Sequence, residues 1–156
     1  MITAIDTNIL LDILIPEELH SLESKRLLDK YVEKGQLILC EIVYAELSSQ
    51  FSSEKGIEEF LSDTGIRFIH SNRETLYLAG ERWKGYTRKR QRALWCPNCG
   101  RKISVVCPEC NHPYTFRDRI LSDFVIGAHA LTQAESFLSR DRGFYNTYFK
   151  ELRIGN

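Results

Sequence analysis

The sequence lacks any hydrophobic run near the roughly 20 residues that a membrane-spanning helix needs. It also lacks a basic stretch at its start, and Asp6 interrupts the apolar residues that a signal peptide would require. We therefore expect a cytoplasmic protein with no membrane partner. Its 156 residues, 43% of them hydrophobic and 27% charged, suit one compact globular domain with a hydrophobic core.

Net charge is also absent, because 21 Lys and Arg residues balance 21 Asp and Glu residues. The charges are nevertheless segregated. Residues 1–80 carry 7 basic and 14 acidic side chains, whereas residues 81–122 carry 10 basic and 3 acidic ones. This pattern suits a protein that binds cations at one place and a polyanion at another. A solvated, Arg-rich helix face explains the same segregation equally well.

Cysteine is scarce, and five residues are too few for a secreted disulfide scaffold. Four of them form two Cys-x-x-Cys pairs with seven residues between them: Cys96 and Cys99, then Cys107 and Cys110. Two such turns supply four thiolates at tetrahedral corners, which predicts structural Zn²⁺ in a zinc ribbon over residues 93–116. Two disulfides are disfavoured in a cytoplasmic chain, and a redox motif would not need duplication. Cys40 is expected to be a small buried hydrophobe.

Basic and aromatic residues surround the predicted ribbon. Tyr86, Trp95 and Tyr114 are positioned in the sequence to stack on nucleic-acid bases. The basic residues are candidates for RNA binding: Lys84, Arg88, Lys89, Arg90, Arg92, Arg101, Lys102, Arg117 and Arg119. Four thiolates around Zn²⁺ carry a net negative charge, which offsets part of this positive charge.

Apolar periodicity predicts strands alternating with helices on both sides of the cysteine segment. Strands are predicted in residues 1–5, 36–40, 65–70, 135–141 and 150–154, with a turn around Gly143 before the last one. Helices are predicted in residues 19–35, 41–51, 56–63, 74–90 and 119–134, and one more begins after the first strand. Ser71 and Glu74 form a candidate capping box. This order predicts an α/β sandwich with a mainly parallel sheet, built from residues 1–92 and 117–156.

Four acidic residues adjoin predicted strands or lie in apolar helices: Asp6, Glu46, Asp123 and Asp141. The carboxyl ends of parallel strands meet at one crevice, so these residues can converge. Each also has a structural explanation, with Asp123 as a helix cap, Asp141 in an Asx-turn and Glu46 on a solvated helix face. Asp6 is the hardest to explain structurally, because burying an unpaired carboxylate is costly.

Carboxylates that share one pocket repel one another unless a hard cation neutralises them. Mg²⁺ prefers oxygen ligands of this kind and retains several waters. A water made more acidic by the metal can attack a phosphodiester while the metal stabilises the developing charge. The four acids are therefore consistent with metal-dependent phosphodiester hydrolysis.

Together the segments IDTNILLD, AEL, SDFVIGAHA and LSRDRGF resemble the PIN domain family in order, spacing and local context. The resemblance covers nearly the whole chain outside the ribbon. It implies a PIN-like three-layer sandwich and an endoribonuclease that uses Mg²⁺ or Mn²⁺. It further implies that the metal is bound by Asp6, Glu46, Asp123 and Asp141, with hydrogen-bonding support from Thr7 or Ser139.

Many small PIN domains resemble toxins of the VapC type, which implies a protein antitoxin and a homodimer as partners besides RNA. Others, of the Nob type, trim ribosomal RNA and carry a zinc ribbon. Two features of this chain differ from the family pattern. The ribbon precedes Asp123, whereas Nob-type proteins carry theirs after the nuclease core, and Gly143 stands where relatives often have a second acid.

Two other function classes fit parts of the sequence. In the first, the protein is a nonenzymatic RNA-binding adaptor that works through the ribbon, and its acids are structural. In the second, it is a phosphatase with Asp6 as nucleophile, although Asn8 stands where haloacid-dehalogenase-like enzymes carry a second Asp. The four acids together favour the nuclease, either a toxin or an RNA-processing enzyme.

Overall fold

The computed structural model describes residues 1–15, 19–89, 94–95, 102–103, 105–112 and 121–155. At its centre is a four-stranded sheet with the order β3-β2-β1-β6, in which every neighbouring pair is parallel. The strands are β1 (Ile2–Ile5), β2 (Gln36–Leu39), β3 (Arg67–Phe68) and β6 (Ser136–Leu138). β1 pairs with β6 through Thr3 and Ser136 up to Ile5 and Leu138, so both strands end at the same edge of the sheet.

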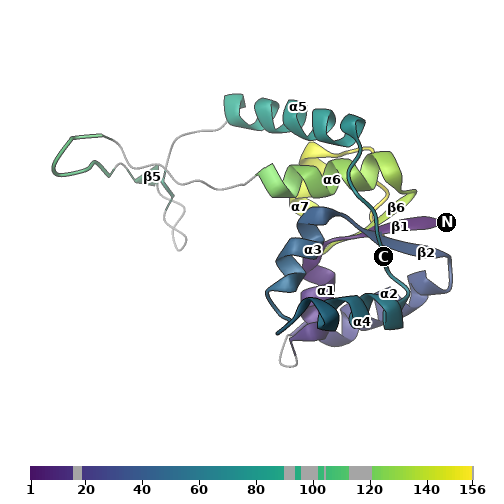
Figure 1. The fold of residues 1–156 in the computed structure, drawn as a ribbon. Coiled ribbons are helices and arrows are strands. Elements are labelled where there is room, and N and C mark those ends of the chain that lie inside the picture. Colours follow the sequence, from purple (N-terminus) through teal and green to yellow (C-terminus); the bar gives the residue numbers. More distant parts are fainter. Residues whose placement is uncertain (16–18, 90–93, 96–101, 104, 113–120, 156) are drawn as a thin grey trace.

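Helices cover both faces of this sheet, which confirms the predicted three-layer arrangement (Figure 1). One face carries α5 (Arg73–Lys89) and α6 (Leu121–Gln133), and the other carries α1 (Thr7–Leu14), α2 (Ser21–Val32) and α4 (Glu54–Thr64). The helix α3 (Glu41–Ser48) contacts both α1 and α6. β1 and β2 are short apolar runs because helices bury them on both sides.

The helix α6 is buried from Phe124 to Ala130 and packs against α7 (Arg142–Tyr148). The Phe124 ring lies 5.0 Å from that of Phe144 and 6.1 Å from that of Phe149. Gly127 allows this approach, since a Cβ there would lie 2.6 Å from the Phe149 ring. Aromatic packing therefore holds α6, and Asp123 in its first turn, against the C-terminal segment.

The C-terminal segment differs from its prediction. We expected a turn around Gly143 and then a strand over residues 150–154, but residues 142–148 form α7. Of the expected strand, the structure has an isolated parallel bridge between Ile154 and Phe137. The aromatic residues of GFYNTY have a high β propensity, but burial of Phe144 and Tyr145 on one helix face outweighs it.

The predicted capping box at Ser71 and Glu74 is also wrong. The Thr75 backbone N–H donates to Oδ1 of Asn72 (2.8 Å), so Asn72 caps α5. Ser71 donates instead to the Glu41 carboxylate, through its backbone N–H at 3.0 Å and its hydroxyl at 2.9 Å. The Ser71 hydroxyl therefore contacts α3 instead of capping α5, and the local sequence does not indicate this contact.

Two further strands lie between α5 and α6 in the chain. β4 (Leu94–Trp95) and β5 (Lys102–Ile103) form an antiparallel pair separate from the main sheet. Both fall inside the segment 93–116, and its assignment as a separate ribbon domain stays a prediction. Across the described ranges, no helix is both long enough and apolar enough to span a membrane.

Candidate active site

Asp6 stands at the junction of β1 and α1, where the carboxyl ends of two neighbouring strands meet. Its backbone N–H donates to the Leu138 carbonyl at 2.9 Å, which continues the β1–β6 pairing by one residue. This pairing brings the chain after β6 against the start of α1. Oδ2 of Asp6 accepts hydrogen bonds from Nδ2 of Asn8 and from Oγ of Ser139, both at 2.6 Å. Ser139 therefore supports Asp6 directly.

The Asp6 carboxylate is buried, with 6% of the residue exposed. Burial raises its pKa from 3.8 to about 6, because a low-dielectric environment disfavours the charged form. The hydrogen bond from Ser139 opposes the increase, whereas the charges of Asp123 and Glu46 add to it. Three of the four predicted acids are therefore close enough to interact.

The other predicted groups reach this region from three helices. Glu46 is an exposed residue of α3, and its Oε2 accepts a hydrogen bond from the Thr7 hydroxyl. Asp123 lies in the first turn of α6, inside the helix rather than at the cap position that its structural explanation requires. Asp141 is the N-cap of α7, where its Oδ1 accepts from the Phe144 N–H at 3.1 Å.

Tyr145 is a member of this region that sequence reasoning missed. Its ring is buried, with 2% of the residue exposed. Burial raises the pKa of this hydroxyl, and the charges of Asp6, Asp123 and Asp141 raise it further. The charges of three of the predicted acids therefore act on this one side chain. The prediction of a turn at Gly143 hid Tyr145, since it placed the residue outside any helix.

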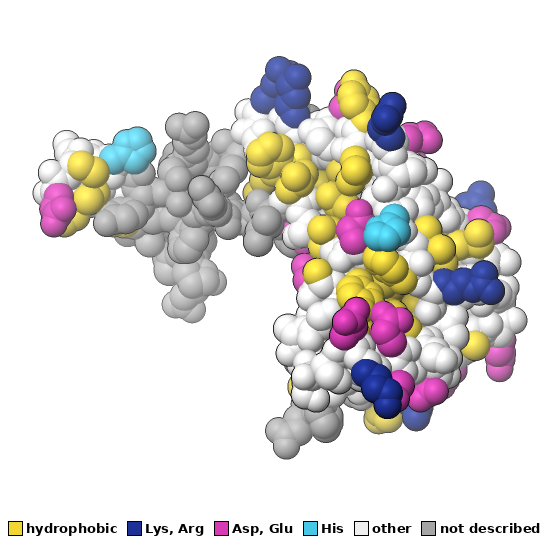
Figure 2. Space-filling model, viewed as in Figure 1, with side chains coloured by type: hydrophobic (Ala, Val, Ile, Leu, Met, Phe, Trp, Pro, Cys, Tyr) yellow, Lys and Arg dark blue, Asp and Glu magenta, His cyan; other side chains and the backbone are white. Residues whose placement is uncertain are grey.

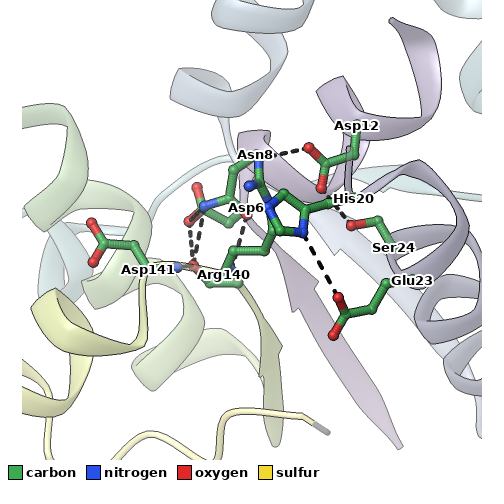
Figure 3. A network of polar contacts seen from close by, with 9 residues as sticks. Asp6, Asn8, Asp12, His20, Glu23, Ser24, Arg140 and Asp141 are labelled. Carbon is green, nitrogen blue, oxygen red and sulfur yellow. Dashed lines mark hydrogen bonds and ion pairs between the residues drawn. The ribbon is translucent and has the colours of Figure 1, made fainter. Parts of the chain in front are cut away.

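A network of polar contacts, which the sequence did not predict, extends from Asp6 along α1 (Figure 3). Oδ1 of Asn8 accepts from the Arg140 backbone N–H at 3.1 Å. Nη2 of Arg140 lies 2.6 Å from Oδ1 of Asp12, a buried residue that also accepts from the Ser24 hydroxyl. One signal of this network was present: Asp12 is an acidic residue within the apolar run NILLDIL.

The carboxylates fit a divalent cation by their chemistry. Among the residues described, no three His, Cys, Asp or Glu side chains lie close enough to enclose a metal ion. Mg²⁺ does not require such a cage, since it retains several waters and is usually held by one or two carboxylates. Asp6 is a buried carboxylate with like charges nearby, and a bound cation would relieve that repulsion.

The family assignment follows from comparison with known proteins. The sequence model of the PIN domain matches residues 3–150. The chain belongs to the PIN domain family. This PIN domain is also similar to a chain in the crystal structure of VapBC2 from Rickettsia felis bound to a DNA fragment from their promoter, with a TM-score of 0.62 and 16% identity over 100% of both chains. That likeness shows a shared fold. No curated protein matches the chain significantly.

The predicted zinc ligands divide between described and undescribed parts of the chain. Cys96 and Cys99 lie outside the described residues. The second pair is in a tight turn, in which the Asn111 N–H donates to the Cys107 carbonyl at 2.8 Å and the Cys107 N–H to the His112 carbonyl at 2.9 Å. Asn111 has a φ of +57°, a left-handed conformation that Asn adopts more readily than most residues. Cys40 is buried, as expected.

The predicted RNA-binding residues are also only partly described. Lys84 and Arg88 are exposed on α5. Figure 2 shows basic side chains near the C-terminal end of this helix, which precedes the segment 93–116. The same view shows acidic side chains over α4. Lys89 and Lys102 belong to α5 and β5, but their side chains are outside the description. The remaining candidates lie outside the described residues: Arg90, Arg92, Arg101, Arg117 and Arg119.

Proposed function

We propose that this PIN domain is an endoribonuclease that hydrolyses RNA phosphodiester bonds with Mg²⁺ or Mn²⁺. The observation that carries the proposal is the Asp6 carboxylate, which is buried at the ends of β1 and β6 among like charges. A purely structural acid at this position would be expected to have a basic partner. Its described side-chain hydrogen-bond donors are instead neutral groups of Asn8 and Ser139.

Asp6, Glu46, Asp123 and Asp141 would hold the cation, one or two of them directly and the others through its bound waters. A bound Mg²⁺ or Mn²⁺ supplies an acidified water and stabilises charge that develops on the phosphate. The protein's own contribution is orientation: Asn8 and Ser139 fix the Asp6 carboxylate, and the Thr7 hydroxyl fixes that of Glu46. Burial of Asp6 limits access of bulk water to one side of the site.

The direct test is cleavage of mixed cellular RNA by the purified protein with and without Mg²⁺ or Mn²⁺. We expect cut ends only when a divalent metal is present, and mapping of those ends would identify the target. A protein that binds RNA but never cuts it with either metal would support the adaptor function instead. A single-stranded DNA of the same sequence is the control for substrate class.

We further propose that the nuclease is the toxin of a toxin–antitoxin pair in the cytoplasm, with a small protein antitoxin and a second copy of the chain as partners. Support comes from the likeness in fold to a chain of VapBC2 over its full length. Under this proposal, coexpression with a DNA-binding protein encoded by the neighbouring gene suppresses RNA cleavage. An adjacent gene for a ribosomal protein or an RNA modification enzyme would favour the RNA-processing role.

We propose that residues 93–116 form a zinc ribbon whose metal is bound by Cys96, Cys99, Cys107 and Cys110. The Cys107–His112 turn supports this, because its backbone conformation brings the two cysteines of the second pair to one turn. The antiparallel strands β4 and β5 are also consistent with a ribbon.

Elemental analysis is expected to find one Zn²⁺ per chain, because all four positions carry cysteine. Cys107→Ser is expected to lose this zinc, whereas Cys40→Ala, which changes the buried cysteine directly after β2, is expected to keep it. Chelation should disorder the ribbon first and leave the sheet and its helices folded, since the ribbon folds around its own metal. Zinc-free protein with four disulfide-bonded thiols, made with zinc in the medium, would contradict the assignment.

We propose that the basic segment around the ribbon binds RNA through phosphate contacts. Replacing Lys89, Arg90 and Arg92 with Ala is expected to weaken RNA binding and to reduce the salt dependence of log K by about 2, since each lost contact no longer releases counterions. Lys25→Ala with Lys55→Ala is the control, because both residues are exposed on helices outside the basic segment. A salt slope equal to wild type would show that the three charges are merely solvated.

A further inference from the structure

The loop between β6 and α7 is fixed to the start of α1 by two consecutive residues. Ser139 donates its hydroxyl to Asp6 at 2.6 Å, and the Arg140 N–H donates to Oδ1 of Asn8 at 3.1 Å. Nη2 of Arg140 then reaches Oδ1 of Asp12 at 2.6 Å, one turn further along the same helix. Asp141, the next residue, donates its N–H back to the Ser139 hydroxyl at 3.0 Å. Arg140 thus lies between Ser139, which donates to Asp6, and Asp141, a proposed metal ligand.

The ion pair between Asp12 and Arg140 is unusual in its burial. The Asp12 side chain is 1% exposed, whereas that of Arg140 is 38% exposed. Removing a carboxylate from water is costly, and an ion pair of this kind often contributes no more stability than an apolar pair of similar volume. Asp12 lies on an apolar helix whose neighbours Leu10 and Ile13 face the core. Stability alone therefore does not account for an acid at this position.

We propose that Asp12 and Arg140 are positioning residues: their ion pair holds the Ser139–Asp141 segment against α1, so that the carboxylates of Asp6 and Asp141 stay oriented to bind a divalent cation. The inference rests on the proposed metal-dependent function. The pair acts one residue after the Ser139 hydroxyl, which contacts Asp6, and one residue before Asp141. The Ser24 hydroxyl donates to Oδ2 of Asp12, and this contact orients Oδ1 of Asp12 toward Arg140.

Asp12→Asn is the variant that isolates this role. Asp12 is buried and cannot contact RNA, and Asn keeps its size and an oxygen acceptor. Arg140 itself stays unchanged, which matters because it lines a cleft of about 440 Å³ together with Ser139 and Arg142. Changing Arg140 would confound positioning with a direct contact to RNA in that cleft, whereas changing Asp12 does not.

We expect Asp12→Asn to raise the Mn²⁺ dissociation constant, measured by electron paramagnetic resonance of free Mn²⁺, by roughly 10-fold or more. At saturating RNA, kcat should fall while KM for RNA stays near wild type, since no RNA contact is lost. Arg140→Lys retains a cation for Asp12 and should keep most of the wild-type Mn²⁺ affinity. Arg140→Gln removes that cation and should weaken Mn²⁺ binding as Asp12→Asn does. Glu151→Gln is the control, because it makes the same carboxylate-to-amide change in an Arg–carboxylate contact of 2.8 Å, with Arg82, away from the site.

The outcomes are distinguishable. An Asp12→Asn protein that melts earlier yet binds Mn²⁺ and cuts RNA like wild type would show that the pair is only structural. Should Asp12→Asn fail to fold, the double variant Asp12→Asn/Arg140→Gln removes the unpaired charge, and wild-type Mn²⁺ affinity in it would overturn the proposal. A wild-type protein that binds Mn²⁺ but cuts no RNA would overturn the nuclease alone, and the Mn²⁺ titrations would still decide the positioning role. Wild-type protein that binds no Mn²⁺ would overturn both.

Discussion

Replacing Asp6 with Asn is expected to abolish metal-dependent RNA cleavage and to leave the metal-free protein at least as stable as wild type. The loss follows from removing the buried carboxylate around which the other acids are arranged. A metal contributes several kcal/mol of transition-state stabilisation, so losing it should lower the rate by more than about 100-fold. The side-chain carbonyl oxygen of the substituted asparagine can still accept from Asn8 and Ser139, so the local hydrogen bonds survive.

The stability effect of this substitution depends on pH. The folded protein holds a proton on Asp6 more tightly than the unfolded chain does, because burial raises the pKa from 3.8 to about 6. The contribution of Asp6 to stability is therefore full below pH 4 and is lost as the pH rises through 6. Asn does not titrate, so the advantage of Asp6→Asn over wild type should grow across this window toward a limit on the order of 3 kcal/mol.

Saturating Mg²⁺ should reverse this order, since a ligand stabilises only the variant that binds it well. Thermal melts of both proteins between pH 4 and 8, with and without Mg²⁺, would measure the effect, paired with the cleavage assay. The metal-site assignment fails if Asp6→Asn cuts RNA at the wild-type rate. It also fails if this variant melts far lower without metal and gains as much from Mg²⁺ as wild type does.

The parallel sheet was predictable because its strands are short apolar runs followed by helices with a clear hydrophobic face. MITAI and QLIL have no polar face to expose, so both must be covered on two sides. Once β1 and β6 are parallel neighbours, Asp6 and Ser139 necessarily follow adjacent strand ends. The family resemblance implied hydrogen-bonding support of the site from Thr7 or Ser139, and this topology places the Ser139 hydroxyl against Asp6.

Features that depend on contacts between distant segments were not predictable. Residues 142–148 are helical because their aromatic side chains are buried against Phe124 of α6. The local sequence preference of these residues cannot indicate that packing. Asp12 gave a partial signal, as an acid on an apolar helix, but its partner Arg140 is 128 residues away. The burial of Tyr145 near the acids depends on α7, which was itself missed. Candidate site residues that follow strand ends could therefore be named from the sequence, whereas contacts that depend on tertiary packing could not.

In the structure Asp141 is the N-cap of α7, and we propose that it is also a metal ligand, so substitutions that separate these two roles are expected to have different effects. Its carboxylate caps α7 through the Phe144 N–H, and it is also a proposed metal ligand. Asn and Ser are good N-caps, whereas Ala is not. Asp141→Asn and Asp141→Ser should therefore keep the metal-free melting midpoint near wild type, while Asp141→Ala should lose about 1 kcal/mol of stability.

All three Asp141 substitutions are nevertheless expected to lose cleavage by more than about 100-fold, because none supplies a charged oxygen to the cation. The cap also holds α7, which carries the buried Tyr145 near the charges of the site, so Asp141→Ala should lower Mn²⁺ affinity further than Asp141→Asn does. Cleavage rates and Mn²⁺ titrations on the same preparations would measure both effects. Wild-type cleavage by Asp141→Ser would mean that the carboxylate serves only to cap α7, and the cation would then be held by Asp6, Asp123 and Glu46 alone.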